Sequence, residues 1–186
     1  MKNSKITKIT FCGLMTALTV VMSQISVPMP FGVPVTLQTF AICLCGYFLG
    51  LKFGLASILC YVVLGVIGMP VFSGFKGGLS VLFGVTGGYI TGFIFLAVLC
   101  GCSEFFVFRK YGKTVSVLLG IAGLAVCHMC GIIQFSALTG SGIVNAFLTA
   151  TLPFIPKDIV SCLIAYALSA RLSAIVSRHG VLKKTK

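Results

Sequence analysis

The chain has very few acidic residues and few charged residues of any kind. Glu104 and Asp158 are the only acids, charged residues make up 9% of the 186 positions, and hydrophobic residues make up 58%. A soluble globular domain usually carries about 25% charged residues. The polar surface that water requires is therefore missing, which excludes a soluble domain of useful size and predicts that lipid surrounds most of the chain.

Residues for common kinds of catalysis are also missing. No G-x-x-x-x-G-K-[ST] loop is present, which excludes that mode of ATP binding. The only histidines are His128 and His179, so no Ser-His-Asp set can be assembled, and no paired carboxylates are available for acid–base work. No series of intramembrane acids could relay protons. The sequence therefore favours a protein that binds a ligand and is not an enzyme.

The nine cysteines lie inside apolar segments, where free cysteine behaves as a small hydrophobic residue. One cluster, Cys127-His128-Met129-Cys130, places a histidine inside a C-x-x-C pattern. A structural zinc site needs four ligands, and no second pair has suitable spacing. Helix packing is therefore the favoured interpretation, metal binding at this segment is the lesser alternative, and no metal site is predicted.

Long apolar runs, interrupted by glycine, proline or charge, predict an all-α integral membrane protein with six transmembrane helices in a single membrane domain, 1–186. About 20 apolar residues span the hydrocarbon core of a bilayer. The first run imitates a signal peptide, but it is longer than a typical apolar region and no small-residue cleavage site closes it, so we expect a retained helix. The second and third helices are short, which favours tilt or partial burial. The predicted helices are 9–27, 35–49, 53–67, 79–100, 114–135 and 157–176.

The distribution of basic residues predicts the orientation. With both termini in the cytoplasm, twelve of the 14 Lys and Arg residues lie on the inner side, and only Lys76 and Lys157 lie outside. The positive-inside rule therefore favours cytoplasmic termini. Topology also explains the net charge of +12, so no nucleic-acid partner is expected.

The three charged residues on the outer side are the first candidates for a binding site. Lys76 and Lys157 lie where the charge bias gives no reason for them, and Asp158 opens the sixth helix after a Pro-Phe-Ile-Pro turn. An ionisable residue at membrane depth is a binding-site candidate by default, and Lys76 would serve as counter-ion for an anionic ligand. The alternatives are a helix-dipole role for Asp158 and a solvated loop position for Lys76.

Further polar residues gather near the same outer ends of the helices. They could line a pocket with apolar walls, the usual form of a small-molecule site. Alternatively, each makes a hydrogen bond between helices. These residues are Gln24, Ser26, Thr36, Gln38, Thr39, Thr86 and Tyr89.

Gly13 and Ala17 lie four residues apart on the first helix. A small-x-x-x-small pattern lets a second helix approach closely, so this pair predicts contact with a partner protein.

Six segments together resemble the BioY family, the biotin-binding membrane subunits (S components) of energy-coupling factor transporters. The likeness covers nearly the whole chain. The segments are QISVP at 24–28, VPVTLQT at 33–39, GVIGMP at 65–70, FSGFKGG at 72–78, GVTGGY at 84–89 and PFIPKD at 153–158.

The resemblance implies six helices in the bacterial plasma membrane and import of biotin from outside, without a cofactor. The partners it implies are a transmembrane coupling subunit and two cytoplasmic ATPases, and a homo-oligomer stays open. Lys76 would meet the biotin carboxylate and Asp158 the ureido N–H groups, while Gly13 and Ala17 would contact the coupling subunit. The other residues assigned to biotin are Gln24, Thr36, Gln38, Thr86, Tyr89 and Lys157.

The chain departs from the family pattern at three positions. Val85 replaces the usual proline of G-P-T-G-G-Y, and Lys157 replaces a common glycine. A lysine often follows the acid by three residues, whereas this chain has Ser161. Either Lys157 supplies that charge from a different position, or the pocket differs.

Other hypotheses remain beside biotin capture. The outer polar residues could merely join the helices of a structural or scaffold membrane protein, or the ligand could be another small anionic vitamin. A membrane enzyme that uses Asp158 or the 127–130 segment would lack a base and nucleophile pair.

Overall fold

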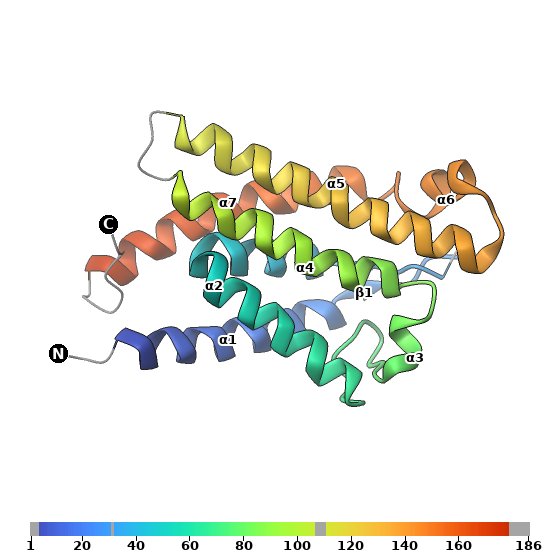
Figure 1. Cartoon of the computed structure of the whole chain (residues 1–186), viewed down its shortest axis with the longest axis horizontal. Helices are drawn as coiled ribbons and strands as arrows, with labels where there is room; N and C mark the ends of the chain where they lie inside the picture. Colours follow the sequence, from blue (N-terminus) through green and yellow to red (C-terminus); the bar gives the residue numbers. More distant parts are fainter. Residues whose placement is uncertain (1–3, 31, 107–110, 179–186) are drawn as a thin grey trace.

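The computed structural model describes residues 4–30, 32–106 and 111–178, and this part of the chain is mostly helical. Five of its helices are long and apolar enough to cross a membrane, and they lie side by side in an elongated bundle (Figure 1). The predicted helical membrane architecture is confirmed at this level. The five are α1 (Ser4–Gln24), α2 (Gln38–Val66), α4 (Gly87–Cys102), α5 (Gly112–Thr139) and α7 (Ile155–Arg178).

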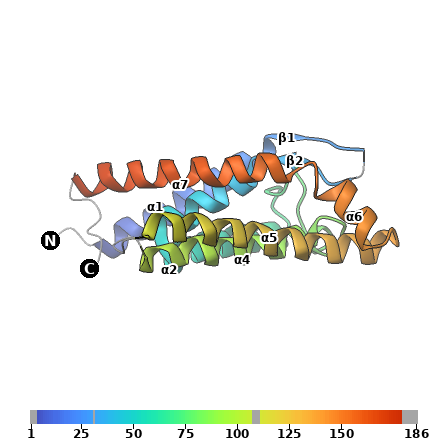
Figure 2. The same cartoon turned by 90° about the horizontal axis from the view of Figure 1, so that it is seen from above.

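The shorter elements divide between the two ends of the bundle. α1 begins and α7 ends at one end, and a 3-10 turn, η1 (Ser103–Phe105), follows α4 there (Figures 1 and 2). The opposite end, which we call the pocket end, carries a two-stranded antiparallel sheet and two short helices. These are β1 (Ser26–Val27), β2 (Val35–Thr36), α3 (Leu79–Leu82) and α6 (Ile143–Ala150).

The strands correct two predicted helix boundaries. We expected the first helix to reach residue 27 and the second to begin at residue 35. Instead α1 ends at Gln24, and Ser26 pairs with Thr36 and Val27 with Val35. The prolines between the strands lack the N–H that a helix would need, which favours a hairpin here.

α2 is a single element that folds back on itself at Gly50. The backbone there is non-helical, with φ of 75°, a conformation that glycine adopts readily. The halves then face each other, because Gln38 donates to the Tyr61 hydroxyl and the Cys45 thiol lies 4.0 Å from the Ser57 hydroxyl. The predicted helices 35–49 and 53–67 correspond to these halves, and Gly50 lies at the break between them.

The prediction of one helix over 79–100 is wrong. α3 ends at Leu82, and α4 begins only at Gly87. The Gln134 side-chain amide of α5 donates to the carbonyls of Leu82 and Gly84, at 2.7 and 2.8 Å, so the break leaves these groups satisfied. A tertiary contact therefore stabilises a break that periodicity alone does not reveal.

The last third of the chain contains a helix that we did not predict. The predicted helices leave 136–156 without a helix, but α5 extends to Thr139 and α6 follows after two glycines with positive φ, Gly140 and Gly142. α7 then begins at Ile155, two residues earlier than expected. Pro156 is tolerated in that first turn because its missing N–H would have no partner there.

Close packing of α4 against α5 positions one wall of the pocket end. A Cβ on Gly92 would lie 2.7 Å from the Cα of Cys127, so only glycine permits this approach. The approach places the Tyr89 ring edge-on to the His128 ring, with centroids 6.2 Å apart.

Candidate functional site

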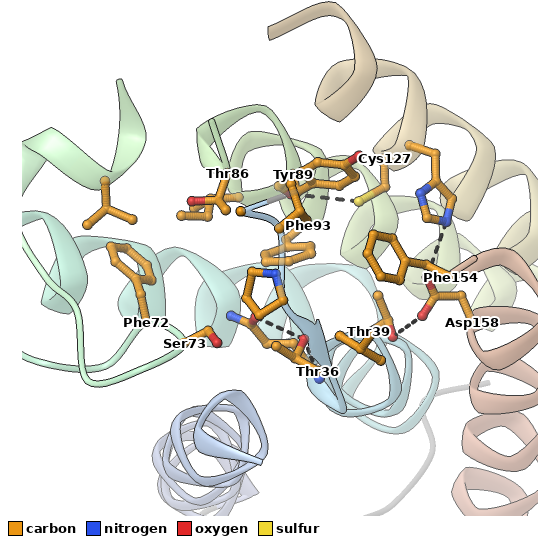
Figure 3. Close-up of a pocket in the computed structure, with 18 of the residues that line it drawn as sticks. Thr36, Thr39, Phe72, Ser73, Thr86, Tyr89, Phe93, Cys127, Phe154 and Asp158 are labelled. Carbon is orange, nitrogen blue, oxygen red and sulfur yellow. Dashed lines mark hydrogen bonds and ion pairs between the residues drawn. The ribbon is translucent and has the colours of Figure 1, made fainter. Parts of the chain in front are cut away.

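A pocket opens at the pocket end, between the strands, the first turns of α2, α4 and α7, and the middle of α5. It contains about 770 Å³ of space, a volume that includes the open solvent in its mouth. Figure 3 shows side chains from these elements converging on it. Its lining is Gly32, Val33, Pro34, Val35, Thr36, Gln38, Thr39, Phe72, Ser73, Lys76, Val81, Thr86, Tyr89, Ile90, Phe93, Cys127, His128, Phe154, Lys157 and Asp158.

The structure brings seven of the eight residues assigned to the ligand into this one lining, and leaves Gln24 out. The Gln24 amide nitrogen donates to the carbonyl of Phe72 at 3.1 Å, and its oxygen accepts from the N–H of Phe75 at 3.0 Å. Gln24 therefore holds the loop that carries Lys76, rather than facing the pocket. The seven lining residues are Thr36, Gln38, Lys76, Thr86, Tyr89, Lys157 and Asp158.

Asp158 forms the floor of the pocket and is 2% exposed. Its Oδ1 atom accepts from the Thr39 hydroxyl at 2.5 Å (Figure 3). The same atom forms an ion pair with the Lys157 ammonium. Lys157 also donates to Thr39 Oγ1 at 3.1 Å and to the Thr36 carbonyl at 2.6 Å. An ammonium group has three N–H donors, so Lys157 is fully engaged by the protein.

The second oxygen of Asp158 has fewer partners. Among the described residues, its one ion-pair or hydrogen-bond partner is His128, whose Nε2 lies 3.2 Å from Oδ2. An ionised carboxylate offers about four acceptor positions. Oδ2 therefore keeps the capacity to accept a hydrogen bond from a ligand, while Oδ1 is occupied.

His128 was not among the residues predicted to line the pocket. Its C-x-x-C context suggested only zinc binding or helix packing, although an ionisable side chain inside an apolar helix is a functional candidate by default. Within the described residues, no group of three or more His, Cys, Asp and Glu is arranged to hold a metal ion. The Cys127 thiol instead faces the Tyr89 carbonyl, at 3.7 Å.

Lys76 is the second charged feature of the pocket. It lies in an exposed loop fixed by backbone hydrogen bonds to Phe72 in both directions, at 2.9 and 3.3 Å. Among the residues that the structure describes, its ammonium group has no ion-pair or hydrogen-bond partner. A cation at the rim is therefore free to meet an anionic group, while Asp158 offers an acceptor at the floor.

Other polar residues of the lining support its shape. Gln38 is buried between Tyr61, to which it donates, and the Thr36 hydroxyl, from which it accepts at 3.4 Å. The Tyr89 hydroxyl donates to the Ala150 carbonyl and lies 3.1 Å from Thr151 Oγ1. The Tyr89 hydroxyl is thus used to anchor the segment after α6, and its ring faces the pocket.

Apolar residues complete the walls. Figure 3 shows the ring of Phe154 beside Asp158, Phe93 next to Tyr89, and Phe72 farther along the lining. No polar or motif signal in the sequence marked these aromatic residues, because they resemble the many other apolar residues of the helices.

Gly13 and Ala17 lie away from the pocket, on α1. Both are exposed, whereas Met15, Thr16 and Thr19 of the same helix are buried. A Cβ on Gly13 would meet nothing within 4 Å. The small residues therefore lie on the unpacked face of α1, where a second helix could approach.

The fold and the site together define a polytopic helical membrane protein with a pocket lined by polar and aromatic side chains at one end. A model of the BioY family matches residues 1–178. The chain therefore belongs to the BioY family.

Individual relatives agree with this membership. The chain is 39% identical to a "Probable biotin transporter BioY" of Pyrococcus horikoshii over 168 residues, which cover 90% of the chain and 97% of that protein. It is 36% identical to the "Biotin transporter BioY" of Thermotoga maritima, over 88% of the chain and 94% of that protein.

A solved structure has the same fold. It is a crystal structure of the S-component for biotin from an ECF-type ABC transporter. It matches with a TM-score of 0.84 and 25% sequence identity, over 92% of this chain and 93% of that chain.

Proposed function

We propose that this protein is the substrate-binding membrane subunit of a biotin importer and captures biotin at the pocket end. The observation that carries the proposal is the pairing, in one pocket, of an unengaged cation at the rim with a buried carboxylate at the floor. Aromatic and aliphatic walls separate the two. Biotin has the matching groups: an anionic tail, an apolar thioether ring and a ureido head with two N–H donors.

Each contact follows from the chemistry of the site. The Lys76 ammonium pairs with the biotin carboxylate, and Asp158 Oδ2 accepts a hydrogen bond from one ureido N–H. Phe72, Phe93 and Phe154 cover the apolar ring system. Hydrogen bonds to a buried charged group contribute about 1.5–3 kcal/mol each, so Asp158 is the main polar determinant of affinity.

The remaining parts of the proposal concern the membrane. Each half of α2 crosses the membrane, so the protein has six membrane crossings in all. The pocket end faces the outside of the cell. This orientation is supported by Lys8, Lys113 and Arg178, which lie near the start of α1, the start of α5 and the end of α7, at the opposite end (Figure 1).

Energy for import comes from a partner. Gly13 and Ala17 contact a transmembrane coupling subunit, which binds two cytoplasmic ATPases. The protein itself binds biotin as a substrate, without altering it chemically and without a cofactor.

Binding of radiolabelled biotin to the purified protein tests the proposal. We expect wild type to retain biotin at nanomolar to micromolar concentrations, and Asp158→Asn to weaken binding at least tenfold, about 1.4 kcal/mol. Glu104→Gln is the matched control. It removes the other acid, whose carboxylate accepts from the N–H of Leu51 at 3.3 Å beside the break in α2, far from the pocket.

Failure of wild type to bind biotin would refute the proposal and favour another anionic vitamin or a scaffold role. Normal affinity in Asp158→Asn would instead refute the role of the floor carboxylate. Thermal unfolding of each purified variant shows whether a loss of binding reflects a loss of folding.

A further inference from the structure

His128 is a buried ionisable residue that the proposed contacts leave unused. Its side chain is 11% exposed, and its Nε2 atom lies 3.2 Å from Oδ2 of Asp158. Both ring nitrogens are buried, and neither has a regular hydrogen-bond partner among the described residues. A buried polar group without a partner is costly, so this arrangement needs an explanation.

Two surfaces hold the His128 ring in place. On one side the Tyr89 ring packs edge-on, with an interplanar angle of 82°, and the Tyr89 hydroxyl is itself anchored to Ala150 and Thr151. On the other side lies Asp158. His128 and Asp158 also line a second, apolar cavity between α5, α6 and α7, so the pair forms the partition between that cavity and the polar pocket.

The two oxygens of Asp158 are held very differently. Thr39 and Lys157 both bind Oδ1, and His128 is the one polar partner of Oδ2 among the described residues. Partners on Oδ1 alone constrain the direction of Oδ2 less firmly than partners on both oxygens would. His128, on α5, is placed to supply a donor to Oδ2 and so to add the second constraint.

We propose that His128 is the positioning residue for Asp158: its Nε2–H holds Oδ2 in the orientation that accepts the ligand N–H. The inference rests on the proposed biotin site and deepens it. In the free protein the His128 Nε2 and Asp158 Oδ2 atoms are close, but they are poorly aligned for a hydrogen bond. Binding sites often tighten such contacts only when the ligand is present. Together, Lys157 and His128 then hold the carboxylate in this chain, where Ser161 occupies the position three residues beyond it.

The test uses three substitutions at position 128, with biotin affinity measured on the purified full chain. His128→Gln places an amide N–H near the position of Nε2, whereas His128→Asn is too short to reach it and His128→Phe keeps the ring without a donor. We expect the Phe and Asn variants to lose about tenfold in affinity, and the Gln variant to stay within about threefold of wild type. Met129→Leu is the control, since Met129 lines the apolar cavity and not the pocket.

A double-substitution cycle separates positioning from packing. If His128 acts through Asp158, His128→Phe changes affinity less than about twofold once Asp158→Asn is present, because interacting residues are not additive. An equal loss in both backgrounds, or equal losses for the Gln and Phe variants, would show a packing role and overturn the inference.

The remaining outcomes are also decisive. Wild-type affinity in His128→Phe would overturn the inference while the proposed function stands, provided that Asp158→Asn still weakens binding. Absence of biotin binding in wild type would overturn both. If His128→Phe does not fold, the comparison of the Gln and Asn variants carries the same test.

Discussion

Replacing Lys76 with alanine tests the rim of the pocket most directly. The side chain is exposed and has no described ion-pair partner, so its removal leaves no buried charge behind. Two unit charges about 4 Å apart interact with about 1 kcal/mol in water and about 4 kcal/mol at an effective dielectric constant of 20. Because Lys76 is exposed, a value close to the low end of this range applies, and we expect biotin affinity to fall about five- to tenfold, about 1–1.4 kcal/mol.

The assay compares biotin with biotinamide, which has the same ring and head but no charge. Lys76→Ala should weaken biotin about five- to tenfold and biotinamide less than about twofold. Added salt should weaken biotin binding to wild type more than to the variant, since salt screens exposed charges. Lys113→Ala is the matched control, because it removes the same charge at the start of α5, at the far end of the bundle.

Two results would refute this reasoning. Equal losses for biotin and biotinamide would mean that Lys76 shapes the loop rather than meeting the carboxylate. An unchanged affinity for biotin would remove Lys76 from the site altogether.

Two further substitutions test parts outside the lining. Gln24→Leu should weaken biotin several-fold and biotinamide less, because the amide of Gln24 holds the loop that carries Lys76; equal losses for the two ligands in the same binding assay would contradict this. Gly13→Leu should leave biotin binding unchanged but block uptake into cells or proteoliposomes that contain the coupling module, since a large side chain would separate the two helices. Loss of binding by the purified variant would argue against the partner contact.

Asp158 and Gly50 show what the sequence could predict. A single acid beside a proline turn in an apolar chain has few possible roles, and it indeed lies at the floor of the pocket. Gly50 lies at the start of a Gly-Leu-Lys interruption between apolar runs, and the structure places the break in α2 there. Both signals are local, because charge and chain flexibility belong to the residue itself.

The unpredicted features depend on contacts between distant segments. The break after Leu82 is stabilised by Gln134, which lies 52 residues away in the sequence. The partnership of His128 with Asp158 joins α5 to α7, and Gly92 permits the close approach of α4. Hydropathy and periodicity describe one helix at a time, so they do not contain these relations.

The exposure of Lys76 and the burial of Asp158 have a kinetic consequence. A charge at an exposed rim acts on an approaching anion before contact and mainly changes the association rate, whereas a buried, hydrogen-bonded charge mainly changes the dissociation rate. In the proposed biotin site, Lys76 would therefore govern how often a ligand enters, and Asp158 would govern how long it stays.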